Sequence, residues 1–338
     1  MTTATAATTS TTSSPTPTSP GTGRAGGGRP DLLVAHNLTE LIGRTPLLQV
    51  PSLDPADATI YAKIEAFNPL SSSKDRVALA MITGAEHRGE LGPRGTVIEA
   101  SSGNTGIALA ALSAARGYGC IVVMPDSATV ERIRIIESFG AQVELTPAAD
   151  GYVAAITRAE DIHNATPDSW FSCQHTNPDN VRAHRETTGP EIWDALGDRI
   201  NTLVCGIGTG GTISGIAGHL KEHKPDIHVV GVEPRRSPIL SEGWGGSHRI
   251  PGLNGGFLAD TTDTSLIDSV VSVTDDEAYE ASRRIMFSTG LSVGISSGAA
   301  YQAACLLARQ PTAADETIVT VFPDTGERYL SWEPAPAS

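Results

Sequence analysis

The sequence has few aromatic residues, few cysteines and no long apolar run. Aromatic residues make up only 5% of the 338 residues, whereas the 35 glycines are abundant, and this combination is typical of a compact α/β enzyme with many tight turns. No apolar stretch approaches the roughly 18 residues that a membrane span needs, so a membrane-spanning class is excluded. The length predicts roughly two domains with ample core.

Basic residues are also scarce. The 24 Lys and Arg residues are outnumbered by 38 Asp and Glu residues, which gives a formal net charge of −14. This charge argues against nucleic acid or an anionic membrane as the main partner.

The four cysteines form no C-x-x-C pair and lie in or beside apolar segments: Cys120, Cys173, Cys205 and Cys305. We therefore expect reduced, buried cysteines and a reducing cytoplasm.

Residues 1–30 differ in composition from the rest of the chain. They are almost entirely Thr, Ser, Ala, Pro and Gly, with Arg24 and Arg29 as the only charged side chains. Such a segment cannot bury apolar surface, so it is predicted to be a disordered tail, and it lacks the hydrophobic core of a secretory signal. Residues 332–338 are interpreted as a second, short tail.

From about residue 36, short β-branched runs alternate with longer helical patterns. Strands are predicted at Ile60–Ile64, Val97–Ala100, Cys120–Met124, Gln142–Leu145, Thr202–Cys205, His228–Val232, Ser269–Val273 and Thr317–Phe322. Helices are predicted at about 75–89, 105–116, 129–139, 151–163, 188–195, 212–223, 276–288 and 298–309. The continuous apolar run Ile121–Met124 indicates a parallel strand buried on both faces. The alternation predicts an α/β fold with two doubly wound domains and mostly parallel sheets.

Lys74 lies in an unusual setting for a cation. It follows the hydroxyl residues Ser71–Ser73 and stands between an apolar strand and a helix-forming run. A surface lysine would gain nothing there, whereas a lysine needed as a neutral amine for imine chemistry would be held there, because partial burial lowers its pKa. A plain helix N-terminus, capped by Ser72 or Ser73, explains the same run equally well.

Two further turns stand at the starts of predicted helices. Ser101–Gly106 follows a strand, and its backbone N–H groups and helix dipole favour a carboxylate or phosphate, although a capped βα turn is the simpler interpretation. In Gly206–Thr212 the glycines let backbone N–H groups approach an anion and the threonines add donors. This second turn also matches the dinucleotide fingerprint, with Glu233 at the spacing of a ribose contact. Spacing alone therefore leaves a nicotinamide oxidoreductase open.

Two weaker motifs complete the set. Gly294–Ala300 is a small-residue turn into a helix, and by itself it is more typical of close helix packing. His219 and His223 fit the H-x-x-E-H pattern of zinc peptidases. They end a helix beside Lys221 and Lys224, where a solvated helix C-terminus fits better than a metal centre. We therefore predict no metal site.

Together these motifs resemble the cysteine synthase (O-acetylserine sulfhydrylase) family of pyridoxal-phosphate enzymes of fold type II. The resemblance runs from Leu38 to Ser331 and is carried by Leu41–Leu47, Asn68–Arg76, Ser102–Gly106, Met124–Pro125, Glu131–Arg132, Thr187–Ile192, Gly208–Thr212, Val232–Pro234 and Pro323–Tyr329. It implies β-replacement on O-acetyl-L-serine, or another activated serine, through an aminoacrylate, giving L-cysteine with sulfide or a related β-substituted alanine. The alternatives within the family are an O-phosphoserine-using cysteine synthase and a cystathionine β-synthase-type enzyme.

The resemblance also implies roles for individual residues. Lys74 would form the internal aldimine with pyridoxal 5'-phosphate and later move protons at the substrate α-carbon. Asn104 would bond the phenolic oxygen of the cofactor, and Ser296 its pyridine nitrogen. The cofactor phosphate would be wrapped by Gly208, Thr209, Gly210, Gly211 and Thr212. The substrate carboxylate would be held by Ser101, Ser102, Asn104, Thr105 and Gln174.

The resemblance, together with the size of the sequence, further implies a homodimer. Residues 31–67 and 178–331 would form a large cofactor-supporting domain, and residues 68–177 a small mobile domain that closes over the amino acid. His175 and Asn254 stand where the family usually has Phe and Gly, and both add hydrogen-bonding groups near the cleft, so they are candidates for an altered second substrate. Arg235 occupies a position where some relatives that use O-phosphoserine bind its phosphate, although exposed arginines after a strand are common.

Overall fold

The fold is described from a computed structural model, which describes Met1 and residues 34–54, 57–101 and 103–331. Apart from Met1, the tail predicted at 1–30 lies outside the described residues, as do the tail at 332–338 and Ser102. The chain from Asn37 onward forms one unit, and the description below concerns that unit.

The strands of this unit form two separate sheets. The strands are β1 (Leu47–Val50), β2 (Thr59–Ile64), β3 (Thr96–Ala100), β4 (Gly119–Pro125), β5 (Gln142–Thr146), β6 (Ser169–Phe171), β7 (Ile200–Gly206), β8 (His228–Pro234), β9 (Ser269–Val273) and β10 (Thr317–Phe322). One sheet has the order β1-β2-β10-β7-β8-β9 and the other β5-β4-β3-β6. Only the β1–β2 pair is antiparallel among these strands, which confirms the prediction of mostly parallel sheets.

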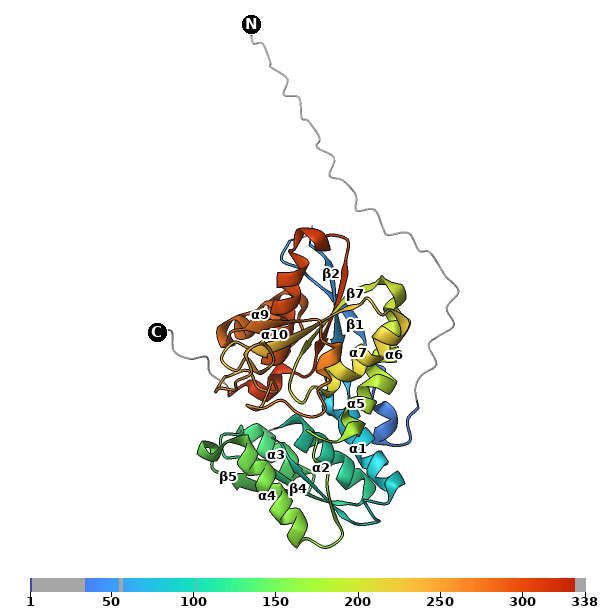
Figure 1. The fold of residues 1–338 in the computed structure, drawn as a ribbon, viewed down its shortest axis with the longest axis vertical. Helices are drawn as coiled ribbons and strands as arrows, with labels where there is room; N and C mark the ends of the chain where they lie inside the picture. The colour runs from blue at the N-terminus through green and yellow to red at the C-terminus, as the bar shows by residue number, and fades with distance from the viewer. Residues whose placement is uncertain (2–33, 55–56, 102, 332–338) are drawn as a thin grey trace. The chain divides into compact units, whose positions relative to one another are not determined.

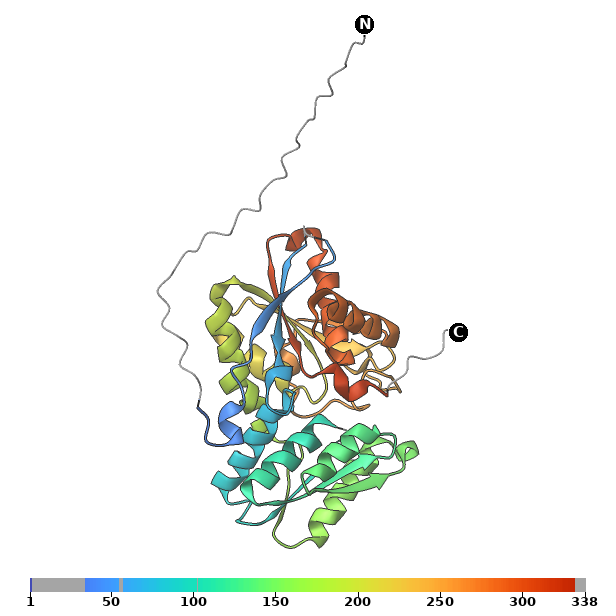
Figure 2. The same cartoon turned by 180° about the vertical axis from the view of Figure 1, so that it is seen from behind.

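Helices cover both faces of each sheet (Figure 1 and, from behind, Figure 2). They are α1 (Lys74–Arg88), α2 (Asn104–Arg116), α3 (Val130–Ser138), α4 (Gly151–Ala165), α5 (Pro178–Ala183), α6 (Gly189–Leu196), α7 (Gly211–His223), α8 (Ile239–Glu242), α9 (Asp275–Thr289) and α10 (Ile295–Ala308). A π-helical turn, His184–Thr188, joins α5 to α6.

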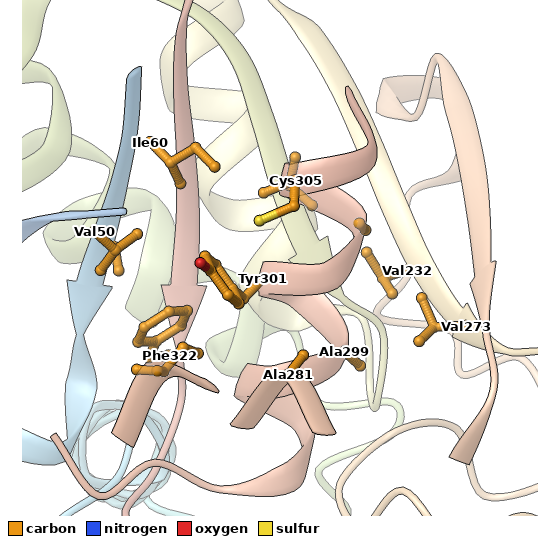
Figure 3. Packing of buried hydrophobic residues seen from close by; sticks show 14 of the residues in the cluster. Val50, Ile60, Val232, Val273, Ala281, Ala299, Tyr301, Cys305 and Phe322 are labelled. Carbon is orange, nitrogen blue, oxygen red and sulfur yellow. The ribbon is translucent and has the colours of Figure 1, made fainter. Parts of the chain in front are cut away.

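The six-stranded sheet buries alternate side chains of β10 on opposite faces, as a parallel strand covered on both sides must. Ile318 and Phe322 pack with residues of α9 and α10, whereas Val319 and Val321 pack with residues of α6 and α7. Figure 3 shows the first of these cores, where Tyr301 of α10 meets Phe322 edge to face with ring centroids 6.4 Å apart. The Tyr301 hydroxyl donates to the Pro51 carbonyl at 2.6 Å, so this buried polar group is satisfied.

The four-stranded sheet is built by the same rule. Val97 and Val122 pack with residues of α1, α2 and α3, whereas Ile98 and Val123 pack with residues of α4. The run Ile121–Met124 lies in β4, and its last three residues are fully buried. Both the doubly wound architecture and the buried parallel strand predicted from that run are therefore confirmed.

The elements that the sequence pattern did not predict are short. β1 and β6 have 4 and 3 residues and lie at sheet edges, where little apolar periodicity is needed. α5 and α8 have 6 and 4 residues, too few to show a helical repeat. The predicted strands and the eight predicted helices are all present, with ends that shift by a few residues.

Candidate active site

A pocket lies where the carboxyl ends of β3, β7 and β10 meet, which is the usual ligand position in open α/β sheets. It draws residues from both sheets and from the loops that follow their strands. The predicted site residues that line it are Lys74, Ser101, Asn104, Thr105, Gln174, His175, Gly208, Thr209, Gly210, Thr212 and Ser296. Gly211 is buried beside Asn180, just behind the lining.

Lys74 is the first residue of α1, and it lines the pocket. Burial lowers the pKa of its amine below the ordinary 10.5, and the nearby carboxylates of Asp324 and Glu65 oppose this effect without reversing it. The Ser72 hydroxyl accepts a hydrogen bond from the Lys74 backbone N–H at 3.3 Å. The run therefore combines a Ser72 hydroxyl that accepts from the first N–H of α1, although Ser73 itself makes no side-chain cap bond, with an amine of lowered pKa.

The turn before α2 combines capping with polar groups that face the pocket. Ser101 Oγ accepts from the backbone N–H groups of Gly103 and Gly106, at 3.2 and 3.0 Å, so its lone pairs cap the helix while its own proton stays available to a ligand. Thr105 donates to Gln174 Oε1 at 2.6 Å. The N-terminus of α2 thus borders the pocket, with Ser101, Asn104 and Thr105 on its lining.

The glycine-rich turn before α7 is packed too tightly for side chains. A Cβ at Gly208 would lie 2.3 Å from the Gly252 carbonyl oxygen, and one at Gly210 would lie 2.0 Å from Thr262 Oγ1. Gly210 also has φ +80°, a conformation that favours glycine. The turn therefore brings the N-terminus of the 13-residue helix α7 directly onto the pocket, where N–H groups and the dipole favour an anion.

The small-residue turn at α10 serves two purposes. Ser296 is 4% exposed and lines the pocket. Two residues later, a Cβ at Gly298 would lie 2.0 Å from the Ala278 carbonyl of α9, so this glycine permits the close helix packing that the motif alone indicated. The hydroxyl at the pocket and the packing glycine are parts of the same turn.

Several pocket residues were not assigned a role from the sequence: Arg132, Tyr152, Asp324 and Tyr329. Asp324 follows β10, and its Oδ2 accepts from Asn104 Nδ2 at 2.7 Å and from the Tyr329 hydroxyl. The Arg132 guanidinium lies 4.9 Å from the centre of the Tyr329 ring. The contacts of Asp324 with Asn104 and of Arg132 with Tyr329 join residues that are distant in the sequence, so no local spacing could have indicated them.

Comparison with known proteins identifies the family. A sequence profile of the family described as "Pyridoxal-phosphate dependent enzyme" matches residues 38–324. The chain belongs to this family.

Similar proteins of the pyridoxal-phosphate family span nearly all of the chain. A probable cysteine synthase of Bacillus subtilis is 43% identical over 304 residues, which cover 89% of this chain and 97% of the relative. The crystal structure of a hydrogen sulfide-producing enzyme from Fusobacterium nucleatum matches with a TM-score of 0.84 and 39% identity, over 88% of this chain and 100% of that one. An O-acetylserine dependent cystathionine β-synthase from Helicobacter pylori matches with a TM-score of 0.84 and 36% identity, over 90% and 100%.

The residues present fit the cofactor of this family. Pyridoxal phosphate carries an aldehyde, a phosphate and a ring nitrogen. The pocket offers an amine with a lowered pKa at Lys74, an N–H-lined helix start at Gly208–Gly210, and a buried hydroxyl at Ser296. The alternative of a dinucleotide site has no such support. Its ribose contact would come from Glu233, but the Glu233 carboxylate already accepts from the Leu240 N–H at 2.9 Å and from the Ser241 hydroxyl.

Two of the three specificity candidates lie away from the pocket lining. Asn254 is buried, with its Oδ1 accepting from Ser237 Oγ at 2.7 Å and its Nδ2 donating to the Ser237 carbonyl at 2.9 Å. Arg235 is exposed, and its charge helps to lower the pKa of Glu277. His175 alone of the three lines the pocket.

Of the remaining sequence features, only Cys205 lies on the pocket lining. The rings of His219 and His223 lie 4.6 Å apart at the end of α7, and the described residues contain no group of three or more potential metal ligands. All four cysteines are free, as predicted, but Cys173 is only partly buried. None of the helices in the described part of the chain is long and apolar enough to cross a membrane.

Proposed function

We propose that this enzyme catalyses a β-replacement on O-acetyl-L-serine, in which sulfide displaces acetate to give L-cysteine. The observation that carries the proposal is that the Lys74 amine, with its lowered pKa, lines the same pocket as the N-terminus of α2. The probable cysteine synthase of Bacillus subtilis, 43% identical over nearly its full length, supports this choice of reaction.

The chain's own residues hold the cofactor at three points in this proposal. When bound, pyridoxal phosphate supplies an electrophilic carbon for an amine and an electron sink for the substrate α-carbon. The N-terminus of α7, with Thr209 and Thr212, holds the phosphate. Asn104 donates to the phenolic oxygen, and Ser296 meets the ring nitrogen.

Substrate recognition is assigned to the start of α2. Ser101, Thr105 and Gln174 hold the α-carboxylate, with Asn104 beside them, and Ser102 is assigned the same role although it lies outside the described residues. The Lys74 amine takes the α-proton, because a lysine whose pKa is lowered by burial is more often neutral and can act as a base at the pH of the cell.

We further propose that residues 68–177, which carry the four-stranded sheet, form a small domain that closes on the bound amino acid. The loop 126–130 moves with this domain, and residues 31–67 and 178–331 stay as the cofactor-supporting domain. We assign the active form to a homodimer in a reducing cytoplasm, and the four unpaired cysteines support the reducing compartment.

Two related reactions share this pocket chemistry. The structural likeness to the Helicobacter pylori cystathionine β-synthase favours a sulfur-bearing amino acid as the alternative second substrate. The other reaction uses O-phosphoserine as the donor, whose phosphate an arginine in the pocket would bind. Arg132 lines the pocket and Arg235 does not, so Arg132 is the residue assigned to this phosphate.

The test is direct. Purified holoenzyme is mixed with O-acetyl-L-serine, O-phospho-L-serine or L-serine, and release of acetate or phosphate is followed with and without sulfide. The proposal expects acetate release and cysteine formation, and borohydride reduction should attach the cofactor at Lys74. Lys221→Ala, at a surface ion pair with Asp268, is the control for Lys74→Ala, which should lose about 10²–10⁴-fold in turnover. No release of any leaving group would reject the proposal.

A further inference from the structure

Three ring side chains form one aromatic cluster at the edge of the pocket: Tyr152, His175 and Phe257. Tyr152, in the first turn of α4, and His175, in the loop after β6, both line the pocket. Their rings meet edge to face with centroids 5.3 Å apart, and the His175 and Phe257 rings meet in the same way at 5.0 Å. Edge-to-face contacts of this kind hold each ring in one orientation.

The aromatic cluster lies beside the opening of the pocket. Among the described residues that line the pocket, only Gly252 and Gly255 are exposed, so the opening to solvent lies at this loop. A Cβ at Gly255 would lie 3.5 Å from a ring carbon of Tyr152 and 3.5 Å from one of Phe257. A molecule that enters beside Gly255 therefore passes along these two rings.

A hydrogen bond keeps the Tyr152 ring in this position. Its hydroxyl donates to the carbonyl of Ala100, the last residue of β3, and lies 3.3 Å from His175 Nε2. Ala100 directly precedes Ser101, which is assigned to the substrate carboxylate. The Tyr152 ring is thus fixed relative to the place where the amino acid binds.

The aromatic cluster is uncharged and the pocket is small. Burial, with a smaller contribution from the charge of Lys74, lowers the pKa of His175 to about 4, and burial raises the pKa of Tyr152 well above the ordinary 10. The pocket has a volume of about 150 Å³, similar to that of a cavity that holds one benzene ring, and the cofactor ring must share it. A substrate with an ammonium and a carboxylate group would lose water along these neutral rings without gaining an ionic partner from them.

We propose that the aromatic cluster selects the second substrate by size, admitting sulfide and excluding thiols of amino-acid size such as homocysteine. The inference rests on the proposed β-replacement and specifies its nucleophile. Hydrogen sulfide is small and neutral, so it passes the rings without displacing them, whereas a larger thiol must push a ring away from its partners. Tyr152 is therefore a specificity-determining residue of the pocket opening.

The experiment compares kcat/KM of the holoenzyme for L-homocysteine and for sulfide, with O-acetyl-L-serine saturating. Tyr152→Val removes the ring and should raise the ratio of homocysteine to sulfide about tenfold or more, the discrimination that a hydrophobic pocket commonly provides. Tyr152→Phe keeps the ring and should keep a ratio close to wild type. Tyr118→Val is the matched control, because the Tyr118 hydroxyl also donates to a neighbour, Glu86, but Tyr118 does not line the pocket.

Gly255→Ala tests the opening in the opposite direction. The new methyl group would lie at ordinary contact distance from Tyr152 and Phe257, so the variant should fold while its opening is narrower. The ratio of 2-mercaptoethanol to sulfide in kcat/KM should fall. Quenching of the fluorescence of the bound cofactor by acrylamide measures the opening without turnover, and it should increase in Tyr152→Val and decrease in Gly255→Ala.

Two results would overturn the inference: a ratio of homocysteine to sulfide that stays at the wild-type value in Tyr152→Val, or a wild-type enzyme that uses homocysteine as readily as sulfide. If Tyr152→Val does not fold, Gly255→Ala decides, and an unchanged ratio of 2-mercaptoethanol to sulfide there would overturn the inference. Acetate release by the wild-type enzyme with sulfide would still support β-replacement in each case, so the two failures can be told apart.

Discussion

The side-chain amide of Asn104 donates a hydrogen bond to the carboxylate of Asp324, 2.7 Å away and 220 positions later in the chain. Asn104 opens α2 beside the four-stranded sheet, and Asp324 follows β10 of the six-stranded sheet. The other end of the Asn104 amide accepts from Arg328, whose guanidinium also donates to the Leu70 carbonyl. The residue proposed to meet the phenolic oxygen is thus oriented by the end of the described chain.

Asp324→Ala tests this positioning. Removing the carboxylate leaves Arg328 as the only one of these two partners of the Asn104 amide, and the loss of one charge-assisted hydrogen bond of about 1.5–3 kcal/mol should lower kcat/KM for O-acetyl-L-serine at least tenfold. The absorbance band of the bound cofactor should also shift. Asp268→Ala, which breaks a surface pair with Lys221, should leave both unchanged. Wild-type kinetics and spectrum in Asp324→Ala would show that the contact does not position Asn104.

Gly208→Ala tests the phosphate-binding turn. The new Cβ would lie 2.3 Å from a backbone oxygen that cannot swing away, so the turn must shift from the pocket. We expect the dissociation constant of pyridoxal phosphate to rise at least tenfold, measured by titrating the cofactor-free protein. Gly92→Ala is the control, because a Cβ there meets nothing within 4 Å. Equal affinities of the two variants for pyridoxal phosphate would show that the turn does not bind the cofactor.

The buried Glu99 should make stability depend on pH. Desolvation raises its pKa to about 7 from 4.5, although Ser172 and Gln174 donate to it. The folded state then holds a proton that the unfolded state releases between pH 4.5 and 7, so stability falls as pH rises through that window.

The size of this effect is measurable with Glu99→Gln, which cannot titrate. Its free energy of unfolding relative to wild type should rise by about 3 kcal/mol from pH 4.5 to pH 8, at about 1.4 kcal/mol per pKa unit. Urea unfolding at several pH values measures the change. Glu144→Gln, at an exposed pair with Arg158, should give a much smaller slope. A flat difference for Glu99→Gln would contradict the raised pKa.

Arg76, two residues after Lys74, should be essential to the stability of the fold. It is 3% exposed and pairs with Glu65 and with Glu191, each at 2.7 Å. Arg76→Met would leave the Glu65 charge buried without its main partner and should cost about 3–5 kcal/mol of unfolding free energy.

The matched control for Arg76 is Arg158→Met, at a pair with Glu144 in which both side chains are exposed. Exposed pairs contribute roughly 0–1 kcal/mol, so this variant should unfold close to wild type in urea. Equal losses of unfolding free energy in the two variants would show that the buried ion pairs of Arg76 contribute no more than an exposed pair.

The sequence predicts best what depends on neighbouring residues. Lys74 and the turn Gly208–Thr212 could be predicted because a buried amine and a tight anion-binding turn are each set by a run of a few residues. The contact of Asn104 with Asp324 could not, because only the folded sheets bring residues 220 positions apart together. Asn254 was assigned to the cleft, but the local course of its loop turns the side chain to Ser237 instead, and no composition pattern encodes that direction.

The position of β10 has a consequence for biosynthesis of the protein. β10 lies between β2 and β7, so the middle of the larger sheet is filled by the strand that the ribosome makes last among those described. Asp324 and Tyr329, which complete the pocket, follow later still. A nascent chain in which Lys74 has already been synthesised therefore has no catalytic site until β10 and the residues after it follow. A truncation just before β10 would leave two half-sheets with unpaired edges, and not an enzyme of reduced activity.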